Sequence, residues 1–353
     1  MTLTRLRTGL RAGLALLLGL PMAFYGALHA IALFKDGVSA HDLLGCLPLL
    51  PGLTLLALAI ALPWRHRGEG SWKSRLVAVP AVVAGAVFVL APMSMGIYET
   101  HKWRGDVGPA PSAAYREVSF RATDGVKLAG WYRPSANGAT VIVVHGGGSD
   151  RRGSVAHAGL LARHGYGVLL YDARGRGRSE GRQNAWGWGW QRDVEGAIAF
   201  LRGRPEVDPA RLGGLGLSTG ADVLVQVAGS GRDLKAVVAD GTAAGSYDDV
   251  HEVMGVNLAT PMWLTNFATV RLASGTTPGP TLIDMMPRIT APLLMVAAGG
   301  PEKPWGEAYD RAAGDRPVDV WYLPGVAHTA AIREAAPAYE RRVTRFFARA
   351  LLG

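Results

Sequence analysis

The 353-residue chain carries 18% charged and 49% hydrophobic residues, with a formal net charge of +9. Soluble globular chains hold roughly 25% charged residues, so this chain is short of charge, and its apolar content excludes a disordered protein. The single cysteine excludes a disulfide-stapled mini-domain. The location of the deficit decides the class of protein, because a deficit confined to one region indicates membrane segments.

The deficit lies in three runs without Asp, Glu, Lys or Arg, at residues 12–34, 43–64 and 76–98. About 20 apolar residues in a helix cross a hydrocarbon core near 30 Å thick. We therefore predict three transmembrane helices in a membrane anchor that covers residues 1–111; the prolines inside the runs are tolerated in membrane spans. The alternative is a signal peptide cleaved at residues 28–30 and followed by buried helices.

The charges that flank the runs predict the orientation of the anchor. Seven Lys and Arg residues lie before the first run or between the second and third, against three in the other two flanks. Positive flanks stay in the cytoplasm, so we expect a multi-pass protein of the cell (inner) membrane. Three crossings would place everything after residue 98 on the extracytoplasmic side. The lipid bilayer is thus an expected partner.

The basic net charge does not indicate nucleic-acid binding. It divides into +5 for residues 1–111 and +4 for residues 112–353, and the arginines of the second part are scattered. No nucleic-acid-binding motif accompanies them, so we expect no nucleic-acid partner. No zinc, nucleotide or flavin motif is present either, and we expect neither a metal nor a cofactor.

After a linker at residues 105–114, short β-branched runs alternate with amphipathic helices. Asp124-Gly125 between the first two runs is a two-residue hairpin signal. This series predicts an α/β fold, with a mostly parallel sheet, helices on both faces and ligands at the carboxyl ends of the strands. We expect strands at residues 118–123, 126–132, 141–144, 167–171, 212–217, 236–239, 293–297 and 318–323, and helices at 155–163, 190–201, 221–228 and 338–352.

Ser218 lies in Gly216-Leu217-Ser218-Thr219-Gly220, after an expected strand and before an expected helix. This context is the one that a nucleophile elbow requires. The glycines permit a tight turn, and the helix N-terminus favours developing negative charge. The G-x-S-x-G pattern alone is weak in a chain with 47 glycines, and its place after a strand strengthens it.

Two further elements follow expected strands. In His145-Gly146-Gly147-Gly148, the glycines would let backbone N–H groups approach a substrate oxygen. With the N–H of Thr219 they would form an oxyanion hole; the alternative is an ordinary glycine-rich turn. His328, just past the last strand, would take the proton from Ser218 and return it to the leaving group. As an isolated histidine it would instead be structural.

In order and spacing, these three elements resemble the α/β-hydrolase fold family, and the resemblance covers nearly all of residues 112–353. Residues 172–179 are similar to the D-x-R-G-x-G-x-S loop after the family's fourth strand. Residues 207–209 and 211–213 are similar to those of dipeptidyl-peptidase-like and esterase-like members. The resemblance implies the α/β-hydrolase fold, with a structural role for the 172–179 loop.

The resemblance also implies roles for single residues: Ser218 as nucleophile, His328 as general base, and Gly147 and Thr219 as oxyanion donors. The triad acid stays open. In the family it usually follows the strand that we expect at 293–297, where this sequence offers Glu302 and no Asp.

A carboxylate at Glu302 would hold the imidazole tautomer of the base, which makes Glu302 the first candidate for the acid. Asp240, at the end of the preceding strand, is the alternative that some members use. Lys303 beside Glu302 leaves open that Glu302 belongs to a solvated surface pair.

Residues 242–289 are an insertion, and insertions at this point in α/β-hydrolases form a lid over the pocket. Their methionine and aromatic content indicates an apolar binding surface. The alternative is a satellite core that packs the lid onto the sheet. Asp248, Asp249 and Glu252 in the insertion are the obvious carboxylates for binding a free amine.

We therefore expect a membrane-anchored serine hydrolase that cleaves carboxyl esters through an acyl-enzyme intermediate. Its substrate would be a small-molecule ester or a short peptide. The enzyme alternative is a serine aminopeptidase or dipeptidyl-peptidase-like protein. The alternative from another class is a non-catalytic hydrolase-fold binding protein.

Overall fold

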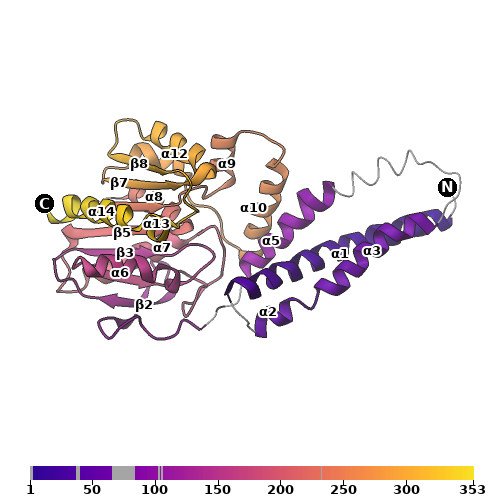
Figure 1. Ribbon diagram of the computed structural model, residues 1–353, viewed down its shortest axis with the longest axis horizontal. Helices are drawn as coiled ribbons and strands as arrows, with labels where there is room; N and C mark the ends of the chain where they lie inside the picture. Colours follow the sequence, from indigo (N-terminus) through magenta and orange to yellow (C-terminus); the bar gives the residue numbers. More distant parts are fainter. Residues whose placement is uncertain (1–2, 37–39, 66–83, 102–103, 105, 232) are drawn as a thin grey trace. The chain divides into compact units, whose positions relative to one another are not determined.

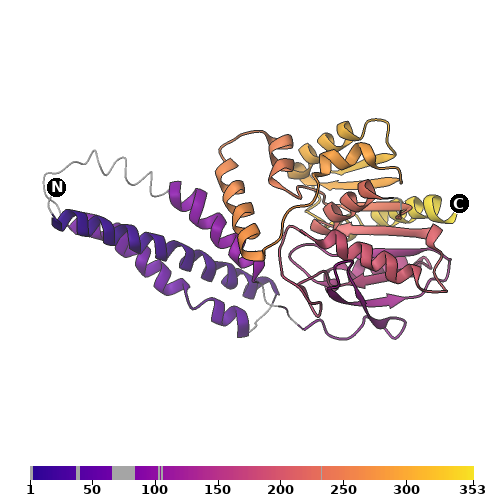
Figure 2. The ribbon, with the colours of Figure 1, turned by 180° about the vertical axis from the view of Figure 1, so that it is seen from behind.

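The computed structural model describes residues 3–36, 40–65, 84–101, 104, 106–231 and 233–353. The chain divides into two compact units. The first comprises Met1–Trp103 and Asn257–Ala273, and the second comprises Arg104–Val256 and Ser274–Gly353. Figure 1 and Figure 2 show the N-terminal helices in indigo and purple and the sheet in magenta to orange.

Apolar helices build the first unit, and α1 packs closely on α3. A Cβ added to Gly52 would lie 2.3 Å from the backbone N of Ala23, and one added to Gly19 would lie 2.8 Å from Leu55 Cβ. Small residues at such a crossing let two backbones approach, as in membrane helix pairs. The elements of the unit are α1 (Leu3–Asp36), α2 (Ala40–Gly45), α3 (Leu49–Arg65), a π-helical turn (Ala86–Leu90), α5 (Ala91–Thr100) and α10 (Thr260–Ser274).

Two stretches among the described residues, not three, are long and apolar enough to cross a membrane. They are Leu10–Ile31 and Asp42–Ala59, and a shorter apolar helix covers Ala86–Thr100. The third predicted span, at 76–98, is therefore not found as a full-length helix. At about 1.5 Å per residue, the 15 residues from Ala86 to Thr100 reach only about 22 Å. Residues 76–83 lie outside the described residues.

The second unit contains an eight-stranded, mostly parallel sheet in the order β1-β2-β4-β3-β5-β6-β7-β8. β2 is antiparallel to both β1 and β4, and all other neighbours are parallel. The predicted α/β fold is thus confirmed. The strands are β1 (Arg116–Arg121), β2 (Lys127–Arg133), β3 (Thr140–Val144), β4 (Gly167–Tyr171), β5 (Leu212–Leu217), β6 (Ala236–Asp240), β7 (Leu293–Ala298) and β8 (Val318–Leu323).

Helices pack on both faces of the sheet, and two adjacent glycines of β5 show how. A Cβ on Gly213 would lie 3.0 Å from Phe347 of α14, whereas a Cβ on Gly214 would lie 3.0 Å from Leu224 of α8. Successive residues of a strand point to opposite faces, so these helices lie on opposite faces. The unit's helices are α6 (Val155–Arg163), α7 (Trp190–Arg202), α8 (Thr219–Ser230), α9 (Tyr247–Met254), α11 (Leu282–Met285), α12 (Gly299–Ala313), α13 (Ala331–Glu334) and α14 (Ala336–Phe347), with short 3₁₀ segments Arg151–Ser154, Pro209–Arg211 and Met286–Arg288 and a π-helical turn at Ala348–Leu352.

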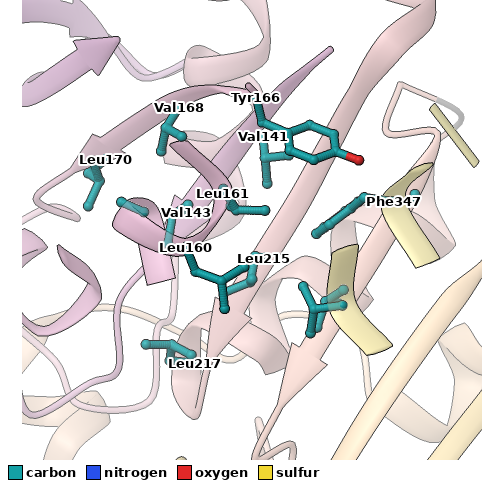
Figure 3. Packing of buried hydrophobic residues seen from close by; sticks show 14 of the residues in the cluster. Val141, Val143, Leu160, Leu161, Tyr166, Val168, Leu170, Leu215, Leu217 and Phe347 are labelled. Atoms are coloured by element: carbon teal, nitrogen blue, oxygen red, sulfur yellow. The ribbon is translucent and has the colours of Figure 1, made fainter. Parts of the chain in front are cut away.

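The core between the sheet and α6 and α14 is apolar and continuous. Val141 and Val143 of β3 and Leu215 of β5 meet Leu161 of α6 and Phe347 of α14 (Figure 3). Strands β3 to β7 are buried along their whole length, which is why they read in the sequence as short apolar runs without alternation.

A buried ion pair holds the 172–179 loop through Asp172. Arg151 donates from Nε and Nη2 to the two carboxylate oxygens of Asp172, at 3.1 and 2.9 Å. The backbone N–H groups of Arg151 and Arg178 also donate to this carboxylate, at 3.0 and 2.9 Å. Both side chains of the pair are at most 1% exposed. The Arg151 guanidinium lies over Trp131, 4.7 Å from the ring centroid, so the pair ties this loop to β2.

The hairpin loop between β1 and β2 is longer than predicted. The strands close at Ala122, whose N–H donates to Val126 O at 2.9 Å, so three residues form the loop instead of two. The N–H of Thr123 donates to Arg192 O of α7, and Asp124 pairs with Arg174 at 2.7 Å. These bonds draw the tip of the hairpin toward α7, and Gly125 closes the loop with φ 87°.

The buried pair gives a test of the fold. Replacing Asp172 with Ala leaves the Arg151 guanidinium buried without its anion, so we expect the free energy of unfolding to fall by about 3–5 kcal/mol. Urea unfolding of the detergent-solubilised full-length protein, followed by tryptophan fluorescence, measures the loss. Asp233→Ala is the control: its pair with Arg202 is half-exposed and should cost less than about 1 kcal/mol. Equal losses in the two variants would contradict the structural role of Asp172.

Candidate active site

Ser218 lies in the turn between the end of β5 and the start of α8, with φ 52° and ψ −123°. A positive φ is uncommon in a residue with a side chain, and such strain gathers at functional sites. Among the described residues, Thr329 is the only other non-glycine with positive φ, and it follows His328. The Ser218 N–H donates to Asp240 O at 2.7 Å, which holds the turn against β6.

The glycines on either side of Ser218 are required by the backbone. A Cβ on Gly216 would lie 2.3 Å from Gly220 O, and a Cβ on Gly220 would lie 2.4 Å from Val144 O. Neither distance is compatible with a side chain, so the strand–turn–helix can close only with glycine at both positions. The chain therefore positions Ser218 at the carboxyl end of β5, where a parallel sheet presents its ligands.

Ser218, His328 and Glu302 lie in one hydrogen-bonded series. The Oγ of Ser218 is 2.9 Å from His328 Nε2, and His328 Nδ1 is 2.6 Å from Glu302 Oε1. The His328 side chain is 51% exposed, whereas that of Glu302 is 7% exposed. A buried carboxylate behind a solvent-accessible imidazole is the arrangement that fixes the tautomer of a general base.

Glu302 is itself held by the helix that carries it. It lies in the first turn of α12, and its Oε2 accepts the N–H of Ala298 at 2.7 Å. One carboxylate oxygen thus satisfies a free N–H at the start of the helix, and the other accepts from His328. This hydrogen bond to Glu302 raises the pKa of His328 above its usual 6.5, although partial burial opposes the shift.

The structure does not bring Asp240, the alternative acid, into this series. The Asp240 side chain is fully buried, its two oxygens have no hydrogen-bond donor among the described residues, and burial raises its pKa to about 7. The Tyr339 hydroxyl lies near this carboxylate but outside hydrogen-bond geometry. Gly241, the residue after β6, contacts His328 instead: a Cβ on Gly241 would lie 2.7 Å from His328 Cε1.

Asp222 is a buried carboxylate near the site that the sequence analysis missed. It lies in the first turn of α8, accepts the N–H of Ala243 at 3.0 Å, and has its pKa raised to about 8 by burial. A single Asp in a helical run carries no signal of burial in the sequence. Thr329 was also missed, because its positive φ depends on the packing of the loop against Gly241.

The two expected oxyanion donors lie beside each other. A Cβ on Gly147 would lie 2.6 Å from Thr219 Oγ1 and 2.2 Å from Ala185 O, and Thr219 Oγ1 donates to that same carbonyl at 2.8 Å. A Cβ on Gly146 would lie 3.4 Å from Ser218 Cβ. The glycine loop after β3 therefore runs directly past the serine, which is the placement that an oxyanion loop needs.

His145 fixes the start of the glycine loop. The N–H of Ala173 donates to its Nε2 at 3.0 Å, so the proton of the neutral ring is on Nδ1, which donates to Gly146 O at 2.8 Å. Complete burial lowers the pKa of His145 below 6.5 and keeps the ring neutral. His145 is thus a structural residue that links the loops after β3 and β4.

Comparison with known proteins agrees with this architecture. The family described as "Serine aminopeptidase, S33" matches residues 135–285. An uncharacterized protein of Mycobacterium tuberculosis is 32% identical over 267 residues, which cover 72% of this chain and 87% of the relative. The uncharacterized protein YfhR of Escherichia coli is 34% identical over 145 residues, covering 39% of this chain and 50% of the relative.

Solved structures show the same fold. An esterase of Pyrococcus furiosus superimposes with a TM-score of 0.59 at 23% identity, covering 71% of this chain and 98% of that chain. Est1E of Butyrivibrio proteoclasticus with bound ferulic acid gives a TM-score of 0.52 at 17% identity, covering 67% and 100%. The resemblance predicted from the motifs is thereby confirmed: this protein is a hydrolase of the α/β-hydrolase fold family, and its residues 135–285 match the family described as serine aminopeptidase, S33.

Proposed function

We propose that the protein is a membrane-anchored serine hydrolase that cleaves carboxyl esters with Ser218, His328 and Glu302. The observation that carries the proposal is the hydrogen-bonded series from Ser218 Oγ through the His328 ring to Glu302, with distances of 2.9 and 2.6 Å. A serine hydroxyl is a weak nucleophile unless a positioned base takes its proton, and the base needs an orienting group behind it. All three components are present at the carboxyl edge of one sheet.

The chemistry follows from these positions. Ser218 Oγ attacks the acyl carbonyl carbon while His328 Nε2 takes its proton, and the backbone N–H groups of Gly147 and Thr219 stabilise the oxyanion. His328 then gives the proton to the leaving alcohol as the C–O bond breaks, which leaves the acyl group on Ser218. Water, deprotonated by the same nitrogen, attacks the acyl-enzyme. As the bond from the acyl carbon to Ser218 Oγ breaks, His328 returns the proton to Oγ and the carboxylic acid is released. Glu302 stabilises the imidazolium in both halves of the reaction.

One of the three carboxylates of the insertion cannot bind a free amine. A peptidase that binds a free N-terminal amine needs an available anion, and Asp249 is not available: it is buried and accepts the N–H groups of Leu282 and Gly245 at 2.6 and 3.1 Å. Asp248 and Glu252 are exposed. The family's description as an aminopeptidase keeps peptide cleavage as the second candidate. The intact series of three side chains disfavours a non-catalytic binding protein.

Anchoring in the membrane is supported by the exposure of the apolar helices. In the most apolar 18-residue segment of Asp42–Ala59, 6% is buried, and in that of Leu10–Ile31, 28% is buried. A core helix of a soluble protein, by contrast, buries most of its apolar surface. We propose an inner-membrane protein with three crossings, the third of which includes the apolar helix Ala86–Thr100. The hydrolase unit would then lie on the extracytoplasmic side.

Removing the nucleophile tests the catalytic assignment. Ser218→Ala should abolish covalent labelling by a fluorophosphonate probe and lower kcat for p-nitrophenyl acetate by about 10⁵–10⁶-fold, because the other groups act only through Oγ. Ser230→Ala, at the end of the same helix, is the control and should leave both measurements unchanged. Labelling of a folded Ser218→Ala protein would refute the assignment.

The pKa of His328 gives a prediction for the pH profile. The imidazole must be neutral to accept a proton, and Glu302 raises its pKa above 6.5, so kcat/KM should be full at high pH and fall as pH drops through that raised pKa. Glu302→Gln removes the largest cause of the shift: the acid limb should move to lower pH and kcat should fall by about 10³–10⁴-fold. Asp240→Asn is the matched comparison, and a larger effect there would make Asp240 the acid.

Reporter fusions test the orientation. Alkaline phosphatase fused after Gly353 should be active and green fluorescent protein at that position dark, because only the former folds outside the cytoplasm. Fusions after Arg65, which follows the second span, should give the opposite pair of results. Fluorescence from the Gly353 fusion would show an even number of crossings.

A further inference from the structure

Helix α10 belongs to the hydrolase insertion by sequence but to the helical unit by its contacts. The chain passes from the second unit to the first between Val256 and Asn257 and returns between Ala273 and Ser274. The 15-residue α10 fills this excursion, whereas α9 before it and α11 after it stay in the hydrolase unit. Part of the segment expected as a lid is therefore a component of the apolar helical unit.

Two polar side chains of α10 point inward, toward the π-helical turn and α5. Thr265 Oγ1 donates to Phe88 O at 3.2 Å. That carbonyl needs a partner, because Pro92, four residues on, has no N–H with which to continue the helix. Asn266 Nδ2 donates to Pro92 O at 3.1 Å. Bonds of this kind satisfy a proline-interrupted helix where water is absent.

The two helices also approach closely. A Cβ on Gly96 would lie 3.0 Å from Thr269 Cβ and 3.3 Å from Asn266 O. Small residues with hydroxyl and amide side chains at a helix crossing are typical of membrane helix pairs. The contacts extend from Phe88 with Thr265 to Gly96 with Thr269, so α10 crosses the π-helical turn and α5.

The outward face of α10 is mostly apolar. Pro261, Leu264, Ala268 and Leu272 are exposed, with Leu264 at 46% and Leu272 at 85%, and Arg271 is exposed beside them. The four apolar residues are spaced three or four residues apart and so share one side of the helix. Phe267 and Val270 are buried, so apolar residues lie on both sides of α10, which is typical of a helix in a large core or a membrane. Ahead of α10 in the same unit, Leu258 is 82% exposed.

A lipid bilayer is the occupant that fits this surface. Contiguous exposed apolar residues mark a membrane or partner interface, and this patch belongs to the same unit as helices whose apolar windows are themselves exposed. The 15 residues of α10 reach about 22 Å, too short to cross the bilayer, and both ends return to the same unit. A helix that enters lipid and returns on the same side is re-entrant.

We propose that α10 is a re-entrant membrane helix and that the substrates are amphiphilic esters whose acyl chains reside in the bilayer. The insertion leaves the sheet at the end of β6, where Asp240 O accepts the Ser218 N–H and Gly241 contacts the His328 ring. The segment that enters lipid is thus covalently continuous with the catalytic edge of the sheet. The substrate class rests on the proposed esterase function.

Fluorescence quenching tests the placement of α10. The full chain with Cys46→Ser and Leu264→Cys, labelled with the environment-sensitive dye NBD and reconstituted in phosphatidylcholine–phosphatidylglycerol vesicles, should be quenched by spin-labelled lipids and shielded from aqueous iodide. The same label at Asp233→Cys, on the hydrolase surface, should respond only to iodide. Iodide quenching of the Leu264 label equal to that control would overturn the re-entrant placement.

Activity tests the substrate class. Leu264→Ser with Leu272→Ser should lower hydrolysis of 4-methylumbelliferyl oleate held in vesicles by at least about tenfold, because two large apolar side chains leave lipid, while hydrolysis of dissolved p-nitrophenyl acetate stays unchanged. Tyr322→Ser, at an exposed site of β8, should change neither. Unchanged oleate hydrolysis with normal acetate hydrolysis would overturn this inference alone. Loss of Ser218-dependent acetate hydrolysis in the parent protein would instead overturn the esterase function.

Discussion

The turn that carries Ser218 constrains the hydrolase unit more than any other feature. A side-chain-bearing residue at φ 52° persists only where its surroundings hold it, and here β6 holds its N–H while Gly216 and Gly220 leave no free space around it. Because β5 lies between β3 and β6 in the sheet, the loops after those two strands necessarily flank the serine. The positions of the glycine loop after β3 and of Asp240–Gly241 after β6 are thus set by strand order, and His328 packs against Gly241.

Burial alone does not distinguish the roles of the unit's carboxylates; their partners do. Asp172 is matched by the guanidinium of Arg151 and serves the fold. Asp222 and Asp240 are buried without a cation, and burial raises the pKa of each, to about 8 and about 7. Glu302 is the buried carboxylate that faces an exposed imidazole. A charge that only a titratable ring compensates supports proton transfer, whereas a charge locked to arginine supports structure.

Helix α10 places both polar and apolar groups inside the helical unit. Thr265 and Asn266 use their polar groups on backbone carbonyls of the neighbouring segment, Phe267 and Val270 are buried, and Leu264 and Leu272 are exposed. One insertion therefore contains α9, whose buried Asp249 bonds to backbone N–H groups of the hydrolase unit, and α10, which clusters with the apolar helices.

The sequence by itself determined the strands, the elbow glycines and the family, because these depend on local periodicity and on backbone space that only glycine leaves. It left open whether Glu302 or Asp240 faces His328, since both follow strands and only the first turn of α12 turns Glu302 toward the ring. It predicted a two-residue hairpin loop. Bonds from Thr123 and Asp124 to distant residues make the loop longer. It also predicted a lid over residues 242–289, without indicating that α10 within them clusters with the helical unit. Those outcomes were decided by the tertiary structure, because each depends on partners far away in the chain, and composition does not encode which element a side chain meets.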